Sequence, residues 1–353
     1  MSTETAGPSS LPGSPLPASP LPAGPSPEAP VVVPGALPFA KGHGTQNDFV
    51  LVADPDGAWV PAAEEVARIC DRRAGIGGDG LIRVVRSAAL PEGAEVAGEA
   101  EWFMDYRNGD GSLAEMCGNG VRVFAEFLLR EGFLPADAGD GRWFAVGTRA
   151  GVKRLRREPD GRWTADMGAW RLTGGEQALA DGSDALVAVA GLGVVRPALS
   201  VDLGNPHTVV ALAEPTELEQ ADLSTAPEVD PVPPHGTNVE LVVPLLGVDV
   251  TGDSRADIGD VRMRVHERGS GETRSCGTGA CAAALAVRAW AGAGGPDVYR
   301  VEVPGGDLVV SVAEGSSLVA GTVWLTGPAV LVAEGTIGEA LLAAPAGGPL
   351  SAA

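Results

Sequence analysis

Two cysteines, Cys117 and Cys276, stand in the same short motif, Cys-Gly-x-Gly, and each follows a polar loop that contains glycine. Each motif also opens an apolar stretch with the pattern of a helix. The thiols are therefore expected at helix N-termini, where free backbone N–H groups and the helix dipole lower a thiol pKa from about 8.5. The glycines let backbone donors approach a bound anion closely. Such a thiol could take up or release a proton.

The surroundings of the two motifs also repeat. Asn47 precedes Cys117 by 70 residues and Asn205 precedes Cys276 by 71, and a similar apolar stretch follows each asparagine. One Cys-Gly-x-Gly match would be weak, but two motifs at matched separation predict two similar halves related by a pseudo-twofold axis. That axis would bring the two helix starts together.

Two thiols on opposite sides of a cleft suit one reaction in particular, the inversion of a stereocentre at carbon. One thiolate removes a proton from one face, and the opposite thiol delivers a proton to the other face. The N–H groups of both helices would hold the substrate carboxylate and stabilise the enolate-like charge that develops on it.

Other fates of the cysteines are less well supported. A free cysteine is most often a small buried apolar residue, and Cys70 and Cys281 are expected in the core. The sequence contains no Cys-x2-Cys pair of the kind that binds zinc, so no metal is expected. Four cysteines in 353 residues are too few for a disulfide scaffold and favour a reducing cytoplasm.

Several elements can be predicted around the motifs. The two clearest are helices over about 118–130, ending at Gly132, and 278–291, ending at Gly292. Residues 173–195 and 213–235 are acidic or low in pattern and are expected to be surface excursions. Short buried strands are predicted at Phe49–Val52, Leu81–Val85, Val209–Leu212 and Val239–Val243, and a hairpin at Val152–Leu155 and Trp163–Met167.

Composition limits the partners. The net charge of −21 argues against a nucleic acid or an anionic membrane, and no apolar run is long enough to span a bilayer. The first 38 residues hold 11 of the 29 prolines, which predicts a disordered tail at residues 1–36 and no secretory signal. Gly75–Gly80 formally matches a dinucleotide-binding loop, but it leads from a helix into a strand, the reverse of that motif.

Seven segments, taken together, resemble the diaminopimelate epimerase family, whose members invert an amino-acid stereocentre without a cofactor. They occur in the family's order over roughly residues 37–340, and the last is long and specific. The segments are Gly44–Phe49, Asp71–Asp79, Asn108–Ser112, Met116–Gly120, Gly204–His207, Gly236–Glu240 and Glu267–Gly279.

The resemblance implies an α/β (α+β) fold with two pseudosymmetric domains, each a twisted, mostly antiparallel sheet wrapped round a central helix, with the active site in the interdomain cleft. The halves would be residues 37–168, joined by a returning strand at about 326–341, and residues 169–325, with a tail at 342–353. It also implies a cytoplasmic homodimer that interconverts LL- and meso-diaminopimelate on the route to lysine and cell-wall peptide. No cofactor is expected, and only Lys41 and Lys153 could have held pyridoxal phosphate.

The resemblance also implies roles for individual residues. Cys117 and Cys276 would be the two acid–base residues. From its place after Pro206, His207 could support a cysteine or the carboxylate pocket, or it could be a hydrogen-bonded structural histidine. Glu267 would help with the substrate's amino groups. The distal amino-acid end would be bound by Asn47, Asn108, Asn205, Asn238 and Arg268, and the reacting carboxylate by Gly118, Asn119, Gly277 and Thr278.

Some alternatives stay open. Asn108 lies in Asn-Gly-Asp-Gly, where asparagine also favours a turn. Many members of the family carry a substrate-binding glutamine where this chain has Gly80, so that contact is absent or replaced. Proline racemases and hydroxyproline epimerases also pair two cysteines, but their first motif usually reads Cys-Gly-His-Gly. A thiol-redox or binding protein of the same fold is a further alternative.

Overall fold

The computed structural model describes residues 37–138, 140–245 and 258–342, and all of them fall in one compact unit. The predicted tail at residues 1–36, and the C-terminal tail beyond Leu342, lie outside the described residues.

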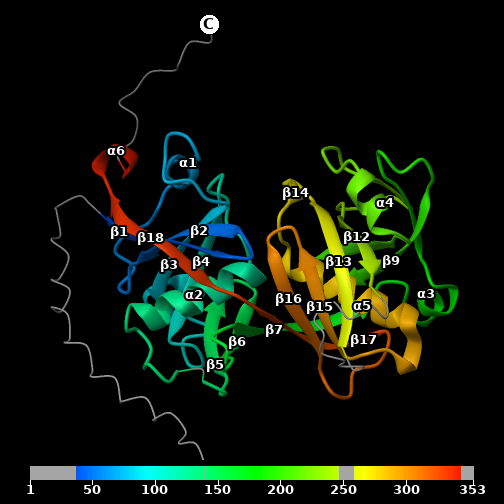
Figure 1. Cartoon of the computed structure of the whole chain (residues 1–353). Coiled ribbons are helices and arrows are strands. Elements are labelled where there is room, and N and C mark those ends of the chain that lie inside the picture. The colour runs from blue at the N-terminus through cyan, green and yellow to red at the C-terminus, as the bar shows by residue number, and fades with distance from the viewer. Residues whose placement is uncertain (1–36, 139, 246–257, 343–353) are drawn as a thin grey trace, which may run out of the picture. The chain divides into compact units, whose positions relative to one another are not determined.

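The N-terminal half is a curved sheet whose strands pair in the order β18-β1-β2-β3-β4-β5-β6-β7. Figure 1 shows the last strand of the chain, β18, returning beside β1, as predicted. The strands are β1 (Leu37–Gly44), β2 (Asn47–Ala53), β3 (Gly80–Arg86), β4 (Trp102–Asn108), β5 (Phe144–Thr148), β6 (Gly151–Arg157), β7 (Trp163–Leu172) and β18 (Val330–Ile337).

The C-terminal half pairs in the order β7-β9-β10-β12-β13-β15-β16-β17, and β17 pairs with β7 again, which closes the ring. The added strands are β9 (Arg196–Asp202), β10 (Pro206–Ala211), β12 (Asn238–Pro244), β13 (Ile258–Glu267), β14 (Gly271–Thr273), β15 (Val298–Val303), β16 (Gly306–Val312) and β17 (Ala320–Gly327).

The two halves have the same pattern of strand directions. The β2–β3 and β4–β5 pairs are parallel in the first half, as are β10–β12 and β13–β15 in the second. The β3–β4 and β5–β6 pairs are antiparallel, as are the equivalent pairs β12–β13 and β15–β16. This identity supports the duplication that the repeated motifs predict.

Each sheet wraps one helix, α2 (Gly118–Arg130) or α5 (Gly277–Ala291), and both bounds agree with the prediction to within one residue. The helix α5 is apolar all round, as a helix enclosed by a sheet must be. Among the described residues, no helix has both the length and the apolar character needed to cross a bilayer. The shorter helices are α1 (Ala63–Cys70), α3 (Gly175–Asp181), α4 (Pro215–Gln220) and α6 (Glu339–Leu342), with 3-10 turns at Ser87–Ala89, Pro91–Gly93 and Gly292–Gly294.

The predicted strands and hairpin are present. Phe49–Val52, Leu81–Val85 and Val239–Val243 lie within β2, β3 and β12, and all but the last residue of Val209–Leu212 lies within β10. The hairpin is β6–β7, with Leu155 opposite Ala165.

The prediction of surface excursions at 173–195 and 213–235 is wrong. These segments form α3 and β8 (Ala185–Ala188), and α4 and β11 (Glu228–Asp230), and the two strands pair with each other. Their scattered apolar residues, such as Val187 and Leu218, build a second hydrophobic core against β10 and β12. Each segment alone has too few apolar residues to show a period, because the core forms only when the two pack together.

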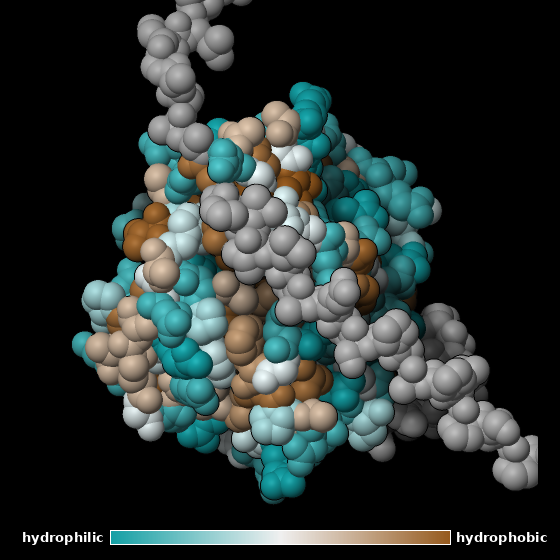
Figure 2. Space-filling view, turned by 90° about the vertical axis from the view of Figure 1, so that its left-hand side faces the viewer, coloured by the Kyte–Doolittle hydropathy of each residue, from teal (hydrophilic) through white to brown (hydrophobic). Residues whose placement is uncertain are grey.

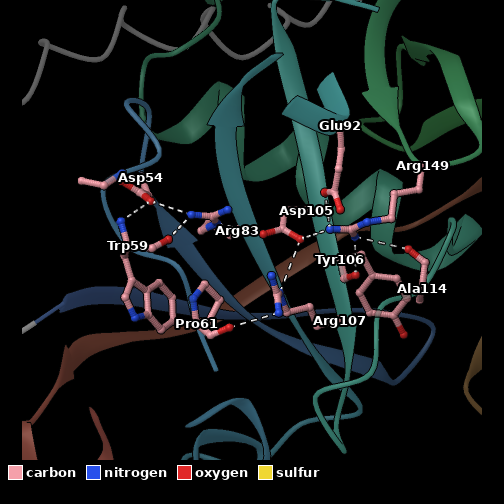
Figure 3. A network of polar contacts seen from close by, with 11 residues as sticks. Asp54, Trp59, Pro61, Arg83, Glu92, Asp105, Tyr106, Arg107, Ala114 and Arg149 are labelled. Carbon is pink, nitrogen blue, oxygen red and sulfur yellow. Dashed lines mark hydrogen bonds and ion pairs between the residues drawn. The ribbon is translucent and has the colours of Figure 1, made fainter. Parts of the chain in front are cut away.

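A largely buried charge network connects the central strands β3 and β4 of the N-terminal half to neighbouring loops. Arg83 on β3 donates to Asp54 at 3.0 Å and to Asp105 at 2.8 Å, and Arg149 donates to Asp105 at 2.5 Å and to Glu92 at 2.9 Å (Figure 3). The buried Arg83 and the partly buried Arg149 therefore both have carboxylate partners, which offset the cost of their burial.

The strand pair β7–β17 joins the two halves. At the start of β7, Trp163 pairs with Arg157 of β6 in the first sheet. At the end of β7, Arg171 and Leu172 pair with β9 in the second sheet. The strand thus contains the predicted boundary at residue 168, and the division at that residue stays a prediction. A continuous ladder between the halves should make them unfold together.

The fully buried Leu325 on β17 tests this coupling, because its side chain touches both helix starts at Gly118 and Gly277. We expect Leu325→Ala to lower the free energy of unfolding by about 2–5 kcal/mol. Urea unfolding followed by tryptophan fluorescence and circular dichroism should remain one coincident transition. The matched control Leu113→Ala, at a side chain that is 53% exposed, should change stability by less than about 0.5 kcal/mol. Two separate transitions would contradict the coupling.

Candidate active site

Both cysteines are the N-cap residues of the enclosed helices, as predicted. The Cys117 Sγ accepts a hydrogen bond from the Gly120 N–H at 3.4 Å, and the Cys276 Sγ accepts one from the Gly279 N–H at 3.3 Å. Their backbones are extended and nearly superimposable, with φ −135° and −118° and ψ 123° and 118°. The two thiols therefore have equivalent places in the two halves.

The two helix starts meet between the halves. A Cβ atom placed on Gly277 would lie 3.3 Å from the Gly118 Cα, and Leu325 contacts both positions. A larger residue at Gly277 would therefore have to displace Leu325 or the opposite backbone, which favours glycine at this position. The predicted meeting of the two helix starts is confirmed.

A chain of polar side chains crosses between the halves beside Cys117. The Asn119 Nδ2 donates to the Asn47 Oδ1 at 3.2 Å and to the Ser275 carbonyl oxygen at 3.2 Å. The Cys117 thiol also donates to the Asn47 Oδ1, at 3.4 Å. The fully buried Thr45 and Ser275 share a hydrogen bond of 2.6 Å between their hydroxyls. Asn47 and Asn119 are thus brought to one thiol, together with two hydroxyl residues to which the sequence analysis assigns no role.

Acidic groups lie beside Cys276 instead. His207 and Glu240 are fully buried, and the His207 Nδ1 lies 2.7 Å from the Glu240 Oε1. A Cβ atom on Gly279 would be 2.8 Å from that oxygen and 3.3 Å from the Cys276 Sγ. Glu267 accepts a hydrogen bond from Thr273 and also interacts with the Cys276 side chain.

Glu240 is a functional candidate that the sequence analysis misses, although its motif contributes to the resemblance. The signal was present, because a carboxylate inside the apolar run Val239–Val243 must be buried and needs a partner.

Three of the five residues that are expected to bind the distal end of the substrate, Asn205, Asn238 and Arg268, lie in the C-terminal half. The Asn205 Nδ2 donates to the Thr278 hydroxyl at 3.3 Å. Asn238 donates to the Pro206 carbonyl at 3.1 Å and accepts from the Arg268 backbone N–H at 2.9 Å. The Arg268 guanidinium donates to the His235 carbonyl at 2.5 Å. Arg268 also lines a cavity of about 760 Å³ in the C-terminal half, which neither cysteine lines.

Asn108 is less directly connected to the site. Its amide donates to Ser112 within its own turn at 3.0 Å, which is the turn role that the sequence left open. The next residue, Gly109, donates its N–H to the Asp79 carbonyl at 2.8 Å, and the Asp79 carboxylate accepts from the Asn47 amide at 2.8 Å. Asn108 therefore lies at the edge of the group around Asn47.

Gly80 has no space for a side chain. A Cβ atom there would lie 2.4 Å from the Arg107 carbonyl oxygen and 2.7 Å from the Tyr106 ring. The close contact with backbone explains why glycine stands at this position.

The expected lowering of the thiol pKa values is wrong as a net effect. Burial raises the pKa of Cys117 to about 11 and that of Cys276 well above its usual value. The N–H groups of Gly120 and Gly279 do lower the two pKa values, but desolvation outweighs them. Glu267 and Glu240 raise the pKa of Cys276 further.

No metal site accompanies the thiols. Within residues 37–138, 140–245 and 258–342, no three or more His, Cys, Asp and Glu side chains are grouped so as to hold a metal ion. The four cysteines are free thiols.

Comparison with solved structures defines the class of fold. A phenazine biosynthesis protein of the PhzF family from Bacillus anthracis has a TM-score of 0.55 at 16% identity, over 86% of this chain and 99% of that one. A hydroxyproline epimerase from Agrobacterium vitis has a TM-score of 0.53 at 13% identity, over 86% and 92%. The chain therefore has the duplicated fold of these proteins.

Sequence comparison then identifies the family. The sequence model of diaminopimelate epimerase matches residues 39–173 and 199–332. The chain is 48% identical to the diaminopimelate epimerase of Streptomyces coelicolor, over 86% of this chain and 96% of that protein. It is 46% identical to that of Thermobifida fusca, over 85% and 97%. The chain belongs to the diaminopimelate epimerase family.

The raised pKa of Cys117 predicts how fast this thiol reacts with iodoacetamide. The thiolate is the reactive form, and its fraction rises with pH. The observed alkylation rate of Cys117 should therefore rise about tenfold per pH unit from roughly pH 7 to 9.5 without levelling off. Peptide mass spectrometry after timed alkylation resolves Cys117 from the other thiols. A plateau near pH 8.5 would show an ordinary thiol pKa and contradict the burial effect.

Proposed function

We propose that this protein is a diaminopimelate epimerase that interconverts LL- and meso-diaminopimelate by proton transfer at one α-carbon. The observation that carries the proposal is the meeting of two cysteine-capped helix starts at the junction of the halves. The family membership supplies the substrate. The product would serve lysine and cell-wall peptide synthesis.

The proposed mechanism uses the two thiols as a matched pair. One cysteine, as thiolate, takes the α-proton, and the other, as thiol, gives its proton to the opposite face of the α-carbon. The two proton transfers of one turnover together exchange the protonation states of Cys117 and Cys276, so the reverse reaction uses the same groups in opposite roles. A buried thiolate with a raised pKa is a stronger base, which suits an α-proton of low acidity.

The negative charge that develops on the reacting carboxylate needs donors held in place beforehand. We assign this role to the helix starts at Gly118, Asn119, Gly277 and Thr278, because the two starts lie close together and each carries the positive end of a helix dipole. This stabilisation replaces the electron sink that a cofactor would supply, and the proposal includes no cofactor.

The remaining polar residues are assigned to the rest of the substrate. Asparagine carbonyls can accept from an ammonium group, and an arginine can bind a carboxylate bidentately. We assign Asn47, Asn108, Asn205, Asn238 and Arg268 to the distal amino-acid group and Glu267 to the substrate's amino groups. Unpaired polar groups in such a site would reject an amino acid with one functional end. His207, which Glu240 holds, would support Cys276.

Exchange in D2O tests this function. The reduced protein is incubated with LL-diaminopimelate, and deuterium at the α-carbon and meso product are followed by NMR. We expect both in the wild type, and a loss of inversion of about 10²–10⁴-fold in Cys117→Ala and in Cys276→Ala, because each removes one acid–base group. The matched control is Cys70→Ala, at a buried cysteine of α1 outside the site, which should retain activity.

Other outcomes would replace the proposal. Exchange with proline or hydroxyproline and none with diaminopimelate would assign a different substrate to the same fold. No exchange with diaminopimelate, proline or hydroxyproline, together with a Cys117–Cys276 disulfide that forms and breaks during function, would indicate a redox protein. For an epimerase, that disulfide only inactivates, so strong reductant should preserve activity. We accordingly place the protein in the reducing cytoplasm.

We also propose a homodimer in which a second copy covers β18. Among the described residues, β18 pairs with β1 alone, and Val330 and Val332 on it are 41% and 56% exposed. On the side of the molecule turned to the viewer in Figure 2, apolar residues reach the surface in several groups. A sheet edge with exposed apolar residues is usually covered in a stable protein.

Light scattering of the full-length protein tests the dimer. We expect the wild type at twice the chain mass and Val332→Glu near the mass of one chain, because a buried charge would oppose pairing. The matched control is Val60→Glu, at a valine 73% exposed outside β18, which should stay dimeric. A monomeric wild type, or a dimeric Val332→Glu, would contradict this interface.

A further inference from the structure

Arg122 is a fully buried cation at the start of α2. It lies in the second turn of the helix, and its side chain folds back toward the N-terminus. The Nη1 donates to the Gly118 carbonyl at 2.9 Å, and the Nη2 donates to the Asn119 Oδ1 at 2.8 Å. The guanidinium is thus attached to the two residues that follow Cys117.

No carboxylate accompanies this cation within the described part of the chain. Arg83, which is also buried in this half, has Asp54 and Asp105 as partners (Figure 3). Burying a charge without a counter-charge is costly, even when its hydrogen bonds are made. A fold that keeps such a cation next to its reacting thiol is therefore arranged for an anion at that place.

The guanidinium has a fitted space. A Cβ atom on Gly44 would lie 3.1 Å from the Nη2, and one on Gly327 would lie 3.0 Å from the same atom. The backbones at the ends of β1 and β17 therefore pack directly against the charge and hold it in place.

Arg122 also sets the orientation of the polar chain beside Cys117. Because the Asn119 Oδ1 accepts from the guanidinium, the Asn119 Nδ2 must be the donor to Asn47. This leaves the Asn47 Oδ1 as the acceptor for the Cys117 thiol. The cation acts on the thiol through two amides as well as through its charge.

The equivalent position in the other half is not a cation. The residue five places after Cys117 is Arg122, and the residue five places after Cys276 is Cys281. Cys276 has carboxylates for neighbours instead, Glu240 from β12 and Glu267 from β13. Glu267 also acts on Cys117, so the two ends differ in two ways: among the described residues, a cation stands beside Cys117 alone of the two thiols, and the Glu240 carboxylate acts on Cys276.

We propose that Arg122 is a positioning residue that makes the two thiols unequal, so that Cys117 is the thiol that ionises first and Cys276 keeps its proton. The inference rests on the proposed epimerase function, whose resting protonation states it names. It also gives Arg122 a second role, the stabilisation of the charge that develops on the substrate carboxylate.

The titratable surroundings agree in direction. Cys117 faces Glu267 from β13, Tyr106 from β4 and Arg122 on its own helix; Glu267 raises its pKa and Arg122, with a smaller effect, lowers it. Cys276 faces Glu240 and Glu267, which both raise its pKa, with His207 from β10 beside them. Burial lowers the pKa of Arg122 to about 10, so the guanidinium stays charged at neutral pH.

Alkylation of the substrate-free protein tests the charge. We expect Arg122→Met to slow iodoacetamide labelling of Cys117 by about tenfold at a fixed pH, the effect of one pKa unit, and to leave Cys276 unchanged. Arg122→Lys keeps the charge and should stay within about threefold of the wild type. The control Arg83→Met removes a buried arginine outside the site, so it should lower Tm without slowing Cys117.

The outcomes are decisive. An unchanged Cys117 rate in a folded Arg122→Met would overturn the proposal. Equal slowing in Arg122→Lys would also overturn it, because hydrogen bonds rather than charge would then be responsible. If Arg122→Met does not fold, Arg122→Gln keeps an amide donor to Asn119 without the charge and is expected to show the same slowing.

Turnover gives the second readout. With diaminopimelate in D2O, Arg122→Met should lose about 10²-fold in kcat with KM changed less than about threefold, because the charge acts on the transition state. A KM effect alone would overturn this second role. Alkylation requires no substrate, so failure of the wild type to turn over diaminopimelate would count against the proposed function only.

Discussion

The approach of two helix N-termini is the constraint on which the rest of the structure depends. At the Gly118–Gly277 contact, the positive dipole ends of two helices lie close together. That arrangement is unfavourable by itself, because like partial charges meet. It becomes favourable when an anion lies between them, which is what an amino-acid carboxylate and a thiolate supply.

The sheets follow from the need to hold that contact rigidly. Each helix is enclosed by its own sheet, and β7 and β17 continue from one sheet into the other. A relative shift of the halves by an ångström would move one thiol away from the α-carbon that the other still faces, and proton transfer is sensitive to such distances. The return of β18 to β1 ties the end of the chain to its beginning for the same reason.

Much of this could be predicted from the sequence, because it depends on local pattern. The apolar helices, the cysteines at their starts and the duplication are all visible in short motifs and their spacing. The second core under residues 173–195 and 213–235 was not, because its apolar residues form a pattern only after two distant segments pair through β8 and β11. The direction of the thiol pKa shifts also depends on burial, which competes with the helix start and which no local motif reports.

Duplication gives the two ends equal backbones, but a reversible two-thiol reaction does not need equal ends. It needs one thiol deprotonated and the other protonated before the substrate arrives, and two identical sites would not set that difference. The side chains supply it: Arg122 stands five residues after Cys117, and carboxylates of Glu240 and Glu267 lie beside Cys276. The symmetry of the backbone thus places one thiol on each side of the α-carbon, and the asymmetry of the buried charges decides which thiol removes the first proton.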